Sequence, residues 1–88
     1  MRPIDKIKRA QVPTYLEHYI PFNSGSTRGR LFGHREYVVY SYDTVICKVD
    51  KITDEVIYFD AAFYSNTTNF IQNLCKEIFI TREVQSYE

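Results

Sequence analysis

The sequence predicts an α+β fold: a four- or five-stranded antiparallel sheet with one main amphipathic helix packed on one face. Three observations predict it. Residues 36–60 form the longest stretch rich in β-branched and aromatic residues, which suit a pleated, half-buried surface. The same stretch shows the clearest alternation of apolar and polar side chains in the chain. Directly after it, apolar residues recur at helical spacing over about residues 68–79.

The first central strand begins at Tyr37, where nearly every residue is aromatic or β-branched. Side chains alternate along a strand, so Tyr37, Val39 and Ser41 are expected to share one face. The link Asp43-Thr44 fits either a tight turn or a bulge within one long bent strand. We favour the bend, because the link contains no glycine to supply a positive φ.

Two further central strands are expected over residues 45–50 and 55–60, joined by a short hairpin loop at 51–54. In the first of them, the pattern predicts that Val45, Cys47 and Val49 face the core. The alternate residues then face outward, and they become polar towards the end of the run.

The first third of the chain is expected to contribute shorter elements. Residues 1–11 form a basic lead that either docks or remains mobile, and Pro13 ends it. Residues 14–22 alternate loosely, which is typical of an edge strand. Residues 23–27 are expected to form a loop, and residues 29–33 a short strand between two glycines.

The helix is expected to start at a capping residue among Thr67, Thr68 and Asn69. Asn69 with Gln72 resembles a capping box. The apolar stripe that faces the sheet consists of Phe70, Ile71, Leu74, Cys75 and Ile78. Residues 82–88 are expected to form a frayed tail. With 88 residues and no internal repeat or long linker, the chain is expected to be one domain, 1–88.

Composition narrows the functional classes. Cys47 and Cys75 belong to no C-x-x-C motif, so buried free thiols are expected. No signal peptide and no membrane span are visible, so we expect a soluble protein of a reducing compartment with no membrane association. His18 and His34 have no companions at metal-ligand spacing, and no nucleophile or phosphate-loop motif occurs. The sequence therefore predicts no enzyme, no metal and no cofactor.

Two segments resemble a known group of proteins. The strand YVVYSYDTVI at residues 37–46, and YSNTT at residues 64–68 followed by Gln72-Asn73, are similar to motifs of small bacteriophage and prophage proteins grouped as a domain of unknown function. The resemblance spans about residues 22–75. It departs from the family pattern at Ile71, where a His is frequent, and at Cys47, where an Ala is frequent. The resemblance implies a phage or mobile-element origin rather than an activity, and with it a location in the cytoplasm of the bacterial host.

A set of hydroxyl-bearing and neighbouring residues is the first candidate site. If the helix packs on the sheet, its N-terminus lies near the link that follows the first central strand. Hydroxyls beside exposed helix N–H groups can bind an anion or a carboxylate. Alternatively, these groups cap the helix and join it to the sheet. The candidate partner-binding residues are Tyr42, Asp43, Thr44, Tyr64, Ser65, Thr67 and Thr68.

A basic set is the second candidate site. The chain has a net charge of zero, but residues 1–35 hold seven basic against two acidic residues, and residues 36–88 hold four against nine. The halves therefore carry +5 and −5. Arginines beside aromatic residues can follow a phosphate backbone, although a pI of about 6.7 is low for a nucleic-acid binder. The candidate contacts to nucleic acid or an acidic partner are Lys6, Lys8, Arg9, Arg28, Arg30 and Arg35.

These observations favour a small, non-enzymatic, phage-derived binding protein that blocks or modulates a host macromolecule, with a host protein as the expected partner. An anti-defence or host-takeover inhibitor is the form of this hypothesis that fits the small size and the eight tyrosines. The alternative is a nucleic-acid-binding phage accessory protein that uses the basic first third. A third hypothesis is a homodimer in which the oppositely charged halves meet.

Overall fold

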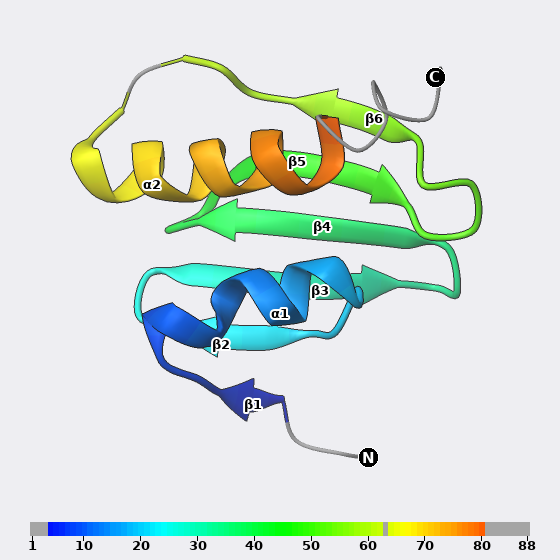
Figure 1. The fold of residues 1–88 in the computed structure, drawn as a ribbon, viewed down its shortest axis with the longest axis horizontal. Helices are drawn as coiled ribbons and strands as arrows, with labels where there is room; N and C mark the ends of the chain where they lie inside the picture. Colours follow the sequence, from blue (N-terminus) through cyan, green and yellow to red (C-terminus); the bar gives the residue numbers. More distant parts are fainter. Residues whose placement is uncertain (1–3, 63, 81–88) are drawn as a thin grey trace.

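In the computed structural model, which describes residues 4–62 and 64–80, six strands follow one another across a single sheet in chain order (Figure 1). The strands are β1 (Asp5–Lys6), β2 (Phe22–Ser24), β3 (Thr27–Phe32), β4 (Glu36–Ser41), β5 (Thr44–Asp50) and β6 (Val56–Phe59). The α+β prediction is confirmed, but the sheet has six strands and is mixed, because β1 pairs parallel with β2. The other pairings in the described part are antiparallel.

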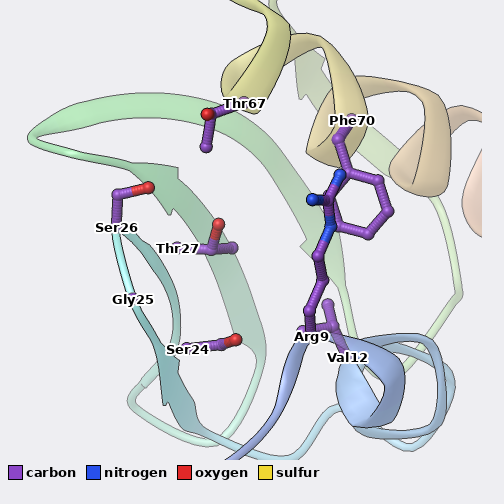
Figure 2. Close-up of a pocket in the computed structure, with 8 residues that line it drawn as sticks. All are labelled: Arg9, Val12, Ser24, Gly25, Ser26, Thr27, Thr67 and Phe70. Carbon is purple, nitrogen blue, oxygen red and sulfur yellow. The ribbon is translucent and has the colours of Figure 1, made fainter.

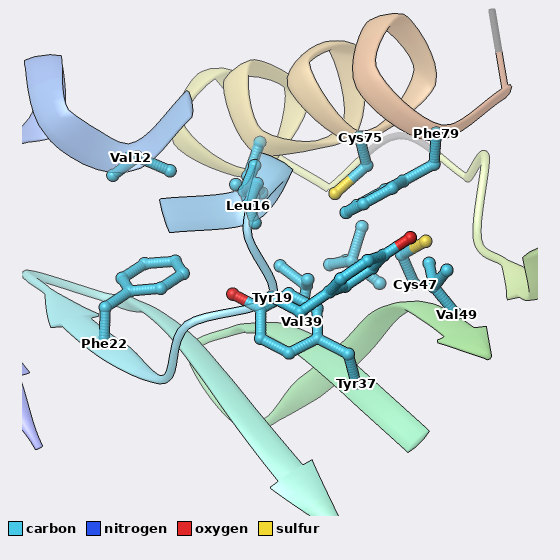
Figure 3. Packing of buried hydrophobic residues seen from close by; sticks show 12 residues of the cluster. Val12, Leu16, Tyr19, Phe22, Tyr37, Val39, Cys47, Val49, Cys75 and Phe79 are labelled. Atoms are coloured by element: carbon cyan, nitrogen blue, oxygen red, sulfur yellow. The ribbon is translucent and has the colours of Figure 1, made fainter. Parts of the chain in front are cut away.

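Both helices, α1 (Val12–Glu17) and α2 (Asn66–Cys75), lie on the same face of the sheet (Figure 1). The three residues expected to share one face of β4, Tyr37, Val39 and Ser41, are all buried on the face that the helices cover. The core between helices and sheet combines Val12 and Leu16 of α1 with side chains of α2 and the central strands (Figure 3). The opposite face of the sheet carries no helix of the described chain.

The expectation that 14–22 is an edge strand is wrong, because residues 14–17 belong to α1 and β2 begins only at Phe22. Val12, Leu16 and Tyr19 recur at intervals of four and three residues, and all three are buried. Pro13 does not end an element; it occupies the first turn of α1, where its missing N–H costs no hydrogen bond. Tyr19 then adopts a φ of 55°, which turns the chain towards β2.

Of the two possibilities for the basic lead, docking is the one observed for residues 4–11, which pack against the edge of the sheet. β1 pairs with β2, and the backbone N–H of Ile7 donates to the Asn23 carbonyl at 2.8 Å. A 3₁₀ turn at Arg9–Gln11 then leads into α1. The prediction of a loop at 23–27 is also wrong, since Ser24 and Thr27 are paired across a tight hairpin whose turn uses Gly25 at a φ of 57°.

The link between β4 and β5 is a tight turn. The prediction of a bend, which is based on the absence of a glycine, is therefore wrong. Ser41 pairs with Thr44, and Tyr42 supplies the positive φ (55°) instead. Two hydrogen bonds hold the turn: the Tyr42 N–H donates to the Ser26 carbonyl at 2.7 Å, and Arg28 donates to the Tyr42 carbonyl at 2.8 Å. Such bonds offset the cost of a left-handed conformation, about 1 kcal/mol for a residue with a Cβ.

A bulge changes the predicted faces of β5. Val39 pairs with Cys47 and Tyr40 with Val45, so Ile46 is the extra residue. Ile46 is buried in the core together with Cys47, whereas Val45 is only half-buried. The prediction that Val45 faces the core and Ile46 faces outward is therefore wrong, while Cys47 and Val49 lie inward as expected.

Helix α2 starts earlier than predicted and ends differently. Ser65 is the N-cap, and its Oγ accepts from the Thr68 N–H at 3.2 Å. The expected caps, Thr67, Thr68 and Asn69, lie inside the helix. A π-helical turn, Lys76–Ile80, continues α2 and buries Phe79. The predicted tail 82–88 lies outside the described residues.

Cys47 and Cys75 are buried and free, as predicted (Figure 3). They come from β5 and α2. Interaction with the Cys47 thiol, together with burial, raises the pKa of Cys75. Within the described residues, no helix is long and apolar enough to cross a membrane.

Candidate functional site

The N-terminus of α2 lies against the end of β4, as the first candidate site required. The hydroxyl oxygens of Ser41 and Thr68 are 2.8 Å apart and buried, and Ser65 caps the helix. Ser65 and Thr68 are therefore occupied in joining the helix to the sheet. This is the alternative role expected for them from the sequence.

The other members of that set are distributed around the same end of the sheet. Tyr42 and Asp43 form the exposed β4–β5 turn, where the Asp43 carboxylate pairs with Arg28 at 3.2 Å. Thr44 is half-buried at the start of β5. Tyr64 is half-exposed and donates to the Asp60 carboxylate at 2.5 Å. This bond lowers the pKa of Asp60 and raises that of Tyr64.

Thr67 is the member of the set that lines a pocket. The pocket has a volume of about 200 Å³ and lies between the 3₁₀ turn, the β2–β3 hairpin and the first turn of α2 (Figure 2). Its hydroxyl groups come from both sides: Ser24, Ser26 and Thr27 from the hairpin, and Thr67 from the helix. Val12 and the ring of Phe70 form its apolar wall.

Arg9 supplies the positive charge of this pocket. Its guanidinium carbon lies 3.8 Å from the centre of the Phe70 ring, a stacked cation–π arrangement. None of the described residues that line the pocket is acidic. Stacking uses the face of the guanidinium and leaves its N–H groups, which lie in the guanidinium plane, available to a ligand.

The helix-free face of the sheet is a second candidate surface. Residues paired across the ladder share a face, so this face holds Arg30, Val38 and Lys48 in one row, continued by Tyr58. The neighbouring rows add Arg28 with Tyr40, and Phe32 with Glu36. We call this surface the open face and define it by Arg28, Arg30, Phe32, Glu36, Val38, Tyr40, Lys48 and Tyr58.

Aromatic rings and cationic groups alternate on the open face. Phe32 and Tyr58 are 52% and 45% exposed, whereas Val38 beneath the longer side chains is only 2% exposed. The Arg28 guanidinium carbon lies 5.2 Å from the centre of the Tyr40 ring. The face therefore combines apolar area with donors, the composition typical of contact surfaces.

The predicted basic set is divided between regions rather than gathered. Arg28 and Arg30 lie on the open face and Arg9 in the pocket, whereas Lys6 is exposed on β1 and Lys8 precedes the 3₁₀ turn. Arg35, beside the β3–β4 turn, donates to the Asp50 carboxylate at 2.7 Å. That bond is the largest reason why the pKa of Asp50 is lowered.

Internal bonds reduce the availability of the strand and turn arginines. Arg30 donates to the carbonyls of Phe22 and Gly29 and to the Asn23 side chain, at 2.6–2.9 Å. The pairs Arg28–Asp43 and Arg35–Asp50 join the basic first part of the chain to its acidic second part. Part of the charge asymmetry is thus satisfied within one chain.

Sequence reasoning misses several functional candidates. It assigns Ser24, Ser26 and Thr27 to a loop, although Ser-Gly-Ser between two β-rich runs is a hairpin signal. It assigns Phe70 to the stripe that faces the sheet, and no local signal indicates that this ring meets Arg9. It places Lys48 on an outward face without connecting it to Tyr58 or to the arginines of β3, because strand order is not visible in the sequence.

Within residues 4–62 and 64–80, no three His, Cys, Asp or Glu side chains cluster closely enough to hold a metal ion. Comparison of the chain with protein-family models, with curated proteins and with solved structures found no match. The geometry of the pocket and of the open face is therefore the basis for inference about function.

Proposed function

We propose that this chain is a small, non-enzymatic binding protein of phage origin that occupies a surface on a host protein through its open face. The observation that carries the proposal is the exposure of Phe32 and Tyr58 on a sheet face that no described helix covers. Large aromatic side chains and arginine are the residue types that dominate binding energy at protein interfaces.

The electrostatics of the open face supports a partner with acidic groups at the contact. Arg28, Arg30 and Lys48 face outward. The acidic residues in the adjoining row are Glu36 and its ladder partner Asp50, which is largely buried and paired with Arg35. Lys48 and Glu36 are 3.9 Å apart and both remain partly exposed, so neither charge is strongly neutralised. The blocking mechanism would be steric, with aromatic anchors at the centre and charge complementarity at the rim.

The test is a pull-down from bacterial lysate with the tagged chain, with and without nuclease. A double variant, Phe32→Ser with Tyr58→Ser, removes both exposed rings of the open face. The matched control is Ile52→Ser, which removes an exposed apolar side chain in the β5–β6 loop. We expect one host protein that survives nuclease, is lost with the double variant and is kept with the control. Capture that is equal for all three proteins would contradict the proposed surface.

Nucleic-acid binding is the second candidate function, because Arg28 and Arg30 lie on neighbouring outward positions of β3 beside Tyr40 and Phe32. Aromatic rings interleaved with cations on a sheet suit the stacking and backbone contacts that bind single strands. The internal bonds of Arg30 count against it. Arg28→Gln with Lys48→Gln leaves those bonds intact. If it abolishes a salt-sensitive affinity for single-stranded DNA or RNA, this second function replaces the first.

The homodimer hypothesis is tested separately by measuring mass in solution at low and high salt. A dimer held together by the oppositely charged halves dissociates as salt is added. A monomeric mass at low salt would remove this hypothesis. The internal pairs Arg28–Asp43 and Arg35–Asp50 already account for part of the asymmetry that motivated it.

A further inference from the structure

The pocket beside α2 contains donors that the fold itself does not use. Thr27 is 6% exposed, and its hydroxyl forms no hydrogen bond within the described part of the chain. Among the described residues, every side-chain oxygen or nitrogen that is fully enclosed has a hydrogen-bond partner. Because the Thr27 hydroxyl has no such partner, its oxygen must be in contact with solvent. Thr27 lines the pocket, and in Figure 2 its oxygen points towards the first turn of α2.

The first turn of α2 adds a second group of unused donors. The first backbone bond of the helix runs from the Asn69 N–H to the Ser65 carbonyl, and the Thr68 N–H is taken by the Ser65 hydroxyl. The N–H groups of Asn66 and Thr67 form no hydrogen bond within the described residues. Such N–H groups carry the partial positive charge of the helix start, and Thr67 places this turn in the pocket wall.

Arg9 adds a full positive charge opposite the helix start. It has no ion pair or hydrogen bond among the described residues, and its stacking on Phe70 fixes the plane of the guanidinium. The pocket thus offers three kinds of donor: the N–H groups of the Arg9 guanidinium, the threonine and serine hydroxyls, and the backbone amides at the helix start. None of the described residues in its lining carries a carboxylate. This combination suits an oxyanion with several oxygens around one centre.

We propose that this pocket binds a phosphoryl group through Arg9, the hydroxyls of Thr27 and Thr67, and the N-terminal amides of α2. Its volume of about 200 Å³ is below the roughly 300–1,000 Å³ of sites that enclose drug-sized ligands. The pocket therefore holds the phosphoryl group alone, and any remainder of the ligand projects into solvent. Inorganic phosphate and a phosphomonoester share this chemistry.

Amide-resolved NMR titration of the full chain tests the proposal. The probes are inorganic phosphate, O-phosphoserine, acetate, and sodium chloride at matched ionic strength. We expect saturable shifts at Gly25, Asn66 and Thr67 with both phosphate probes, and none beyond the salt control with chloride. Equal affinity for phosphoserine and phosphate indicates that the pocket recognises the phosphoryl group alone. A higher affinity for phosphoserine indicates that the ester portion also makes contacts.

Two variants and one control make the test specific. Thr27→Val keeps the shape of the side chain and removes the unused hydroxyl, so it should leave stability unchanged and weaken phosphate binding roughly tenfold, the loss typical of a hydrogen bond to a charged group. Arg9→Gln should weaken it at least as much. Lys8→Gln removes the neighbouring exposed cation, which does not line the pocket, and should leave affinity nearly unchanged.

Three results would overturn the proposal. The first is an absence of phosphate-specific shifts beyond the salt control. The second is acetate binding as tightly as phosphate, which would make the pocket a general carboxylate site. The third is phosphate affinity that is unchanged in both Thr27→Val and Arg9→Gln, which would place binding elsewhere. If Thr27→Val proves unstable, Arg9→Gln and the position of the amide shifts still decide between these outcomes.

Discussion

Replacement of Gly29 by alanine should destabilise the fold through a single close contact. Gly29 in β3 lies beneath the buried rings of Phe22 and Tyr37. A Cβ at this position would lie 2.5 Å from the Tyr37 hydroxyl oxygen and 2.6 Å from Cε1 of Phe22. Favourable separations between such atoms are about 3.5–4.0 Å. Both rings are fully buried, so neither can move aside without displacing the core.

The expected cost of Gly29→Ala is about 1–3 kcal/mol, the usual cost of inserting a methyl group into a packed core. The backbone of Gly29 does not adopt a positive φ, so no conformational strain adds to the contact. Alanine also lowers the entropy of the unfolded chain, which offsets about 0.4–1 kcal/mol. For a domain of this size, the remaining net loss of about 1 kcal/mol lowers Tm by roughly 4–8 °C.

Urea unfolding followed by far-UV circular dichroism measures this loss as a change in midpoint at constant m-value. The companion variant is Tyr37→Phe, which removes the hydroxyl nearest to the new methyl group. Alone it should cost about 1–3 kcal/mol, because the Ile20 carbonyl loses a donor at 2.9 Å. The double variant should lose less than the sum, with a coupling above about 0.5 kcal/mol. A free energy of unfolding for Gly29→Ala within about 0.5 kcal/mol of the original would refute the packing argument.

Three further predictions concern the N-cap of α2, the loss of stability at low pH and the reactivity of the two buried thiols. Ser65→Ala should lower the free energy of unfolding by about 0.5–2 kcal/mol, because the Thr68 N–H loses its N-cap acceptor. Asn66→Ala, inside the first turn of α2, is the near-neutral control in the same urea unfolding experiment, and equal losses for the two variants would argue against the cap. The pKa of Asp50 is lowered in the folded state by Arg35 and by two backbone N–H groups, so its stabilisation is present above the unfolded pKa and is lost as pH falls below about 4. Asp50→Asn should flatten that decline in urea midpoints, and an unchanged slope would count against the assignment. Cys47 and Cys75 should react with a thiol reagent only as fast as the chain unfolds, since both are buried; immediate reaction of both under native conditions would contradict the packing.

The central sheet could be predicted because its signals are local. Alternation in β4 groups Tyr37, Val39 and Ser41 on one face, and the apolar stripe of α2 identifies the buried residues Ile71 and Cys75. Both patterns follow from the geometry of one element and need no knowledge of its neighbours. The errors in this region occur where that geometry is interrupted, at the Ile46 bulge and at the Tyr42 turn, which depends on bonds from β3.

The segment 12–19 shows why shorter elements are harder to predict. Over so few residues, apolar positions fit a strand or a helix almost equally well. Tertiary packing selects the helix, since it buries Val12, Leu16 and Tyr19 together against the sheet and α2. A helix of six residues has little stability of its own, so its neighbours determine it.

Local patterns are sufficient to establish the α+β class, the residues that share a face of β4, the amphipathic stripe of α2 and the two buried thiols. Which polar groups are occupied and which remain available depends instead on how the elements pack. Arg9 and Phe70 are distant in the chain, and they meet only because α1 and α2 cover the same face. The pocket arises from such distant segments. The open face arises from consecutive strands, but which face the helices leave uncovered is decided by the packing of the whole core rather than by any local pattern.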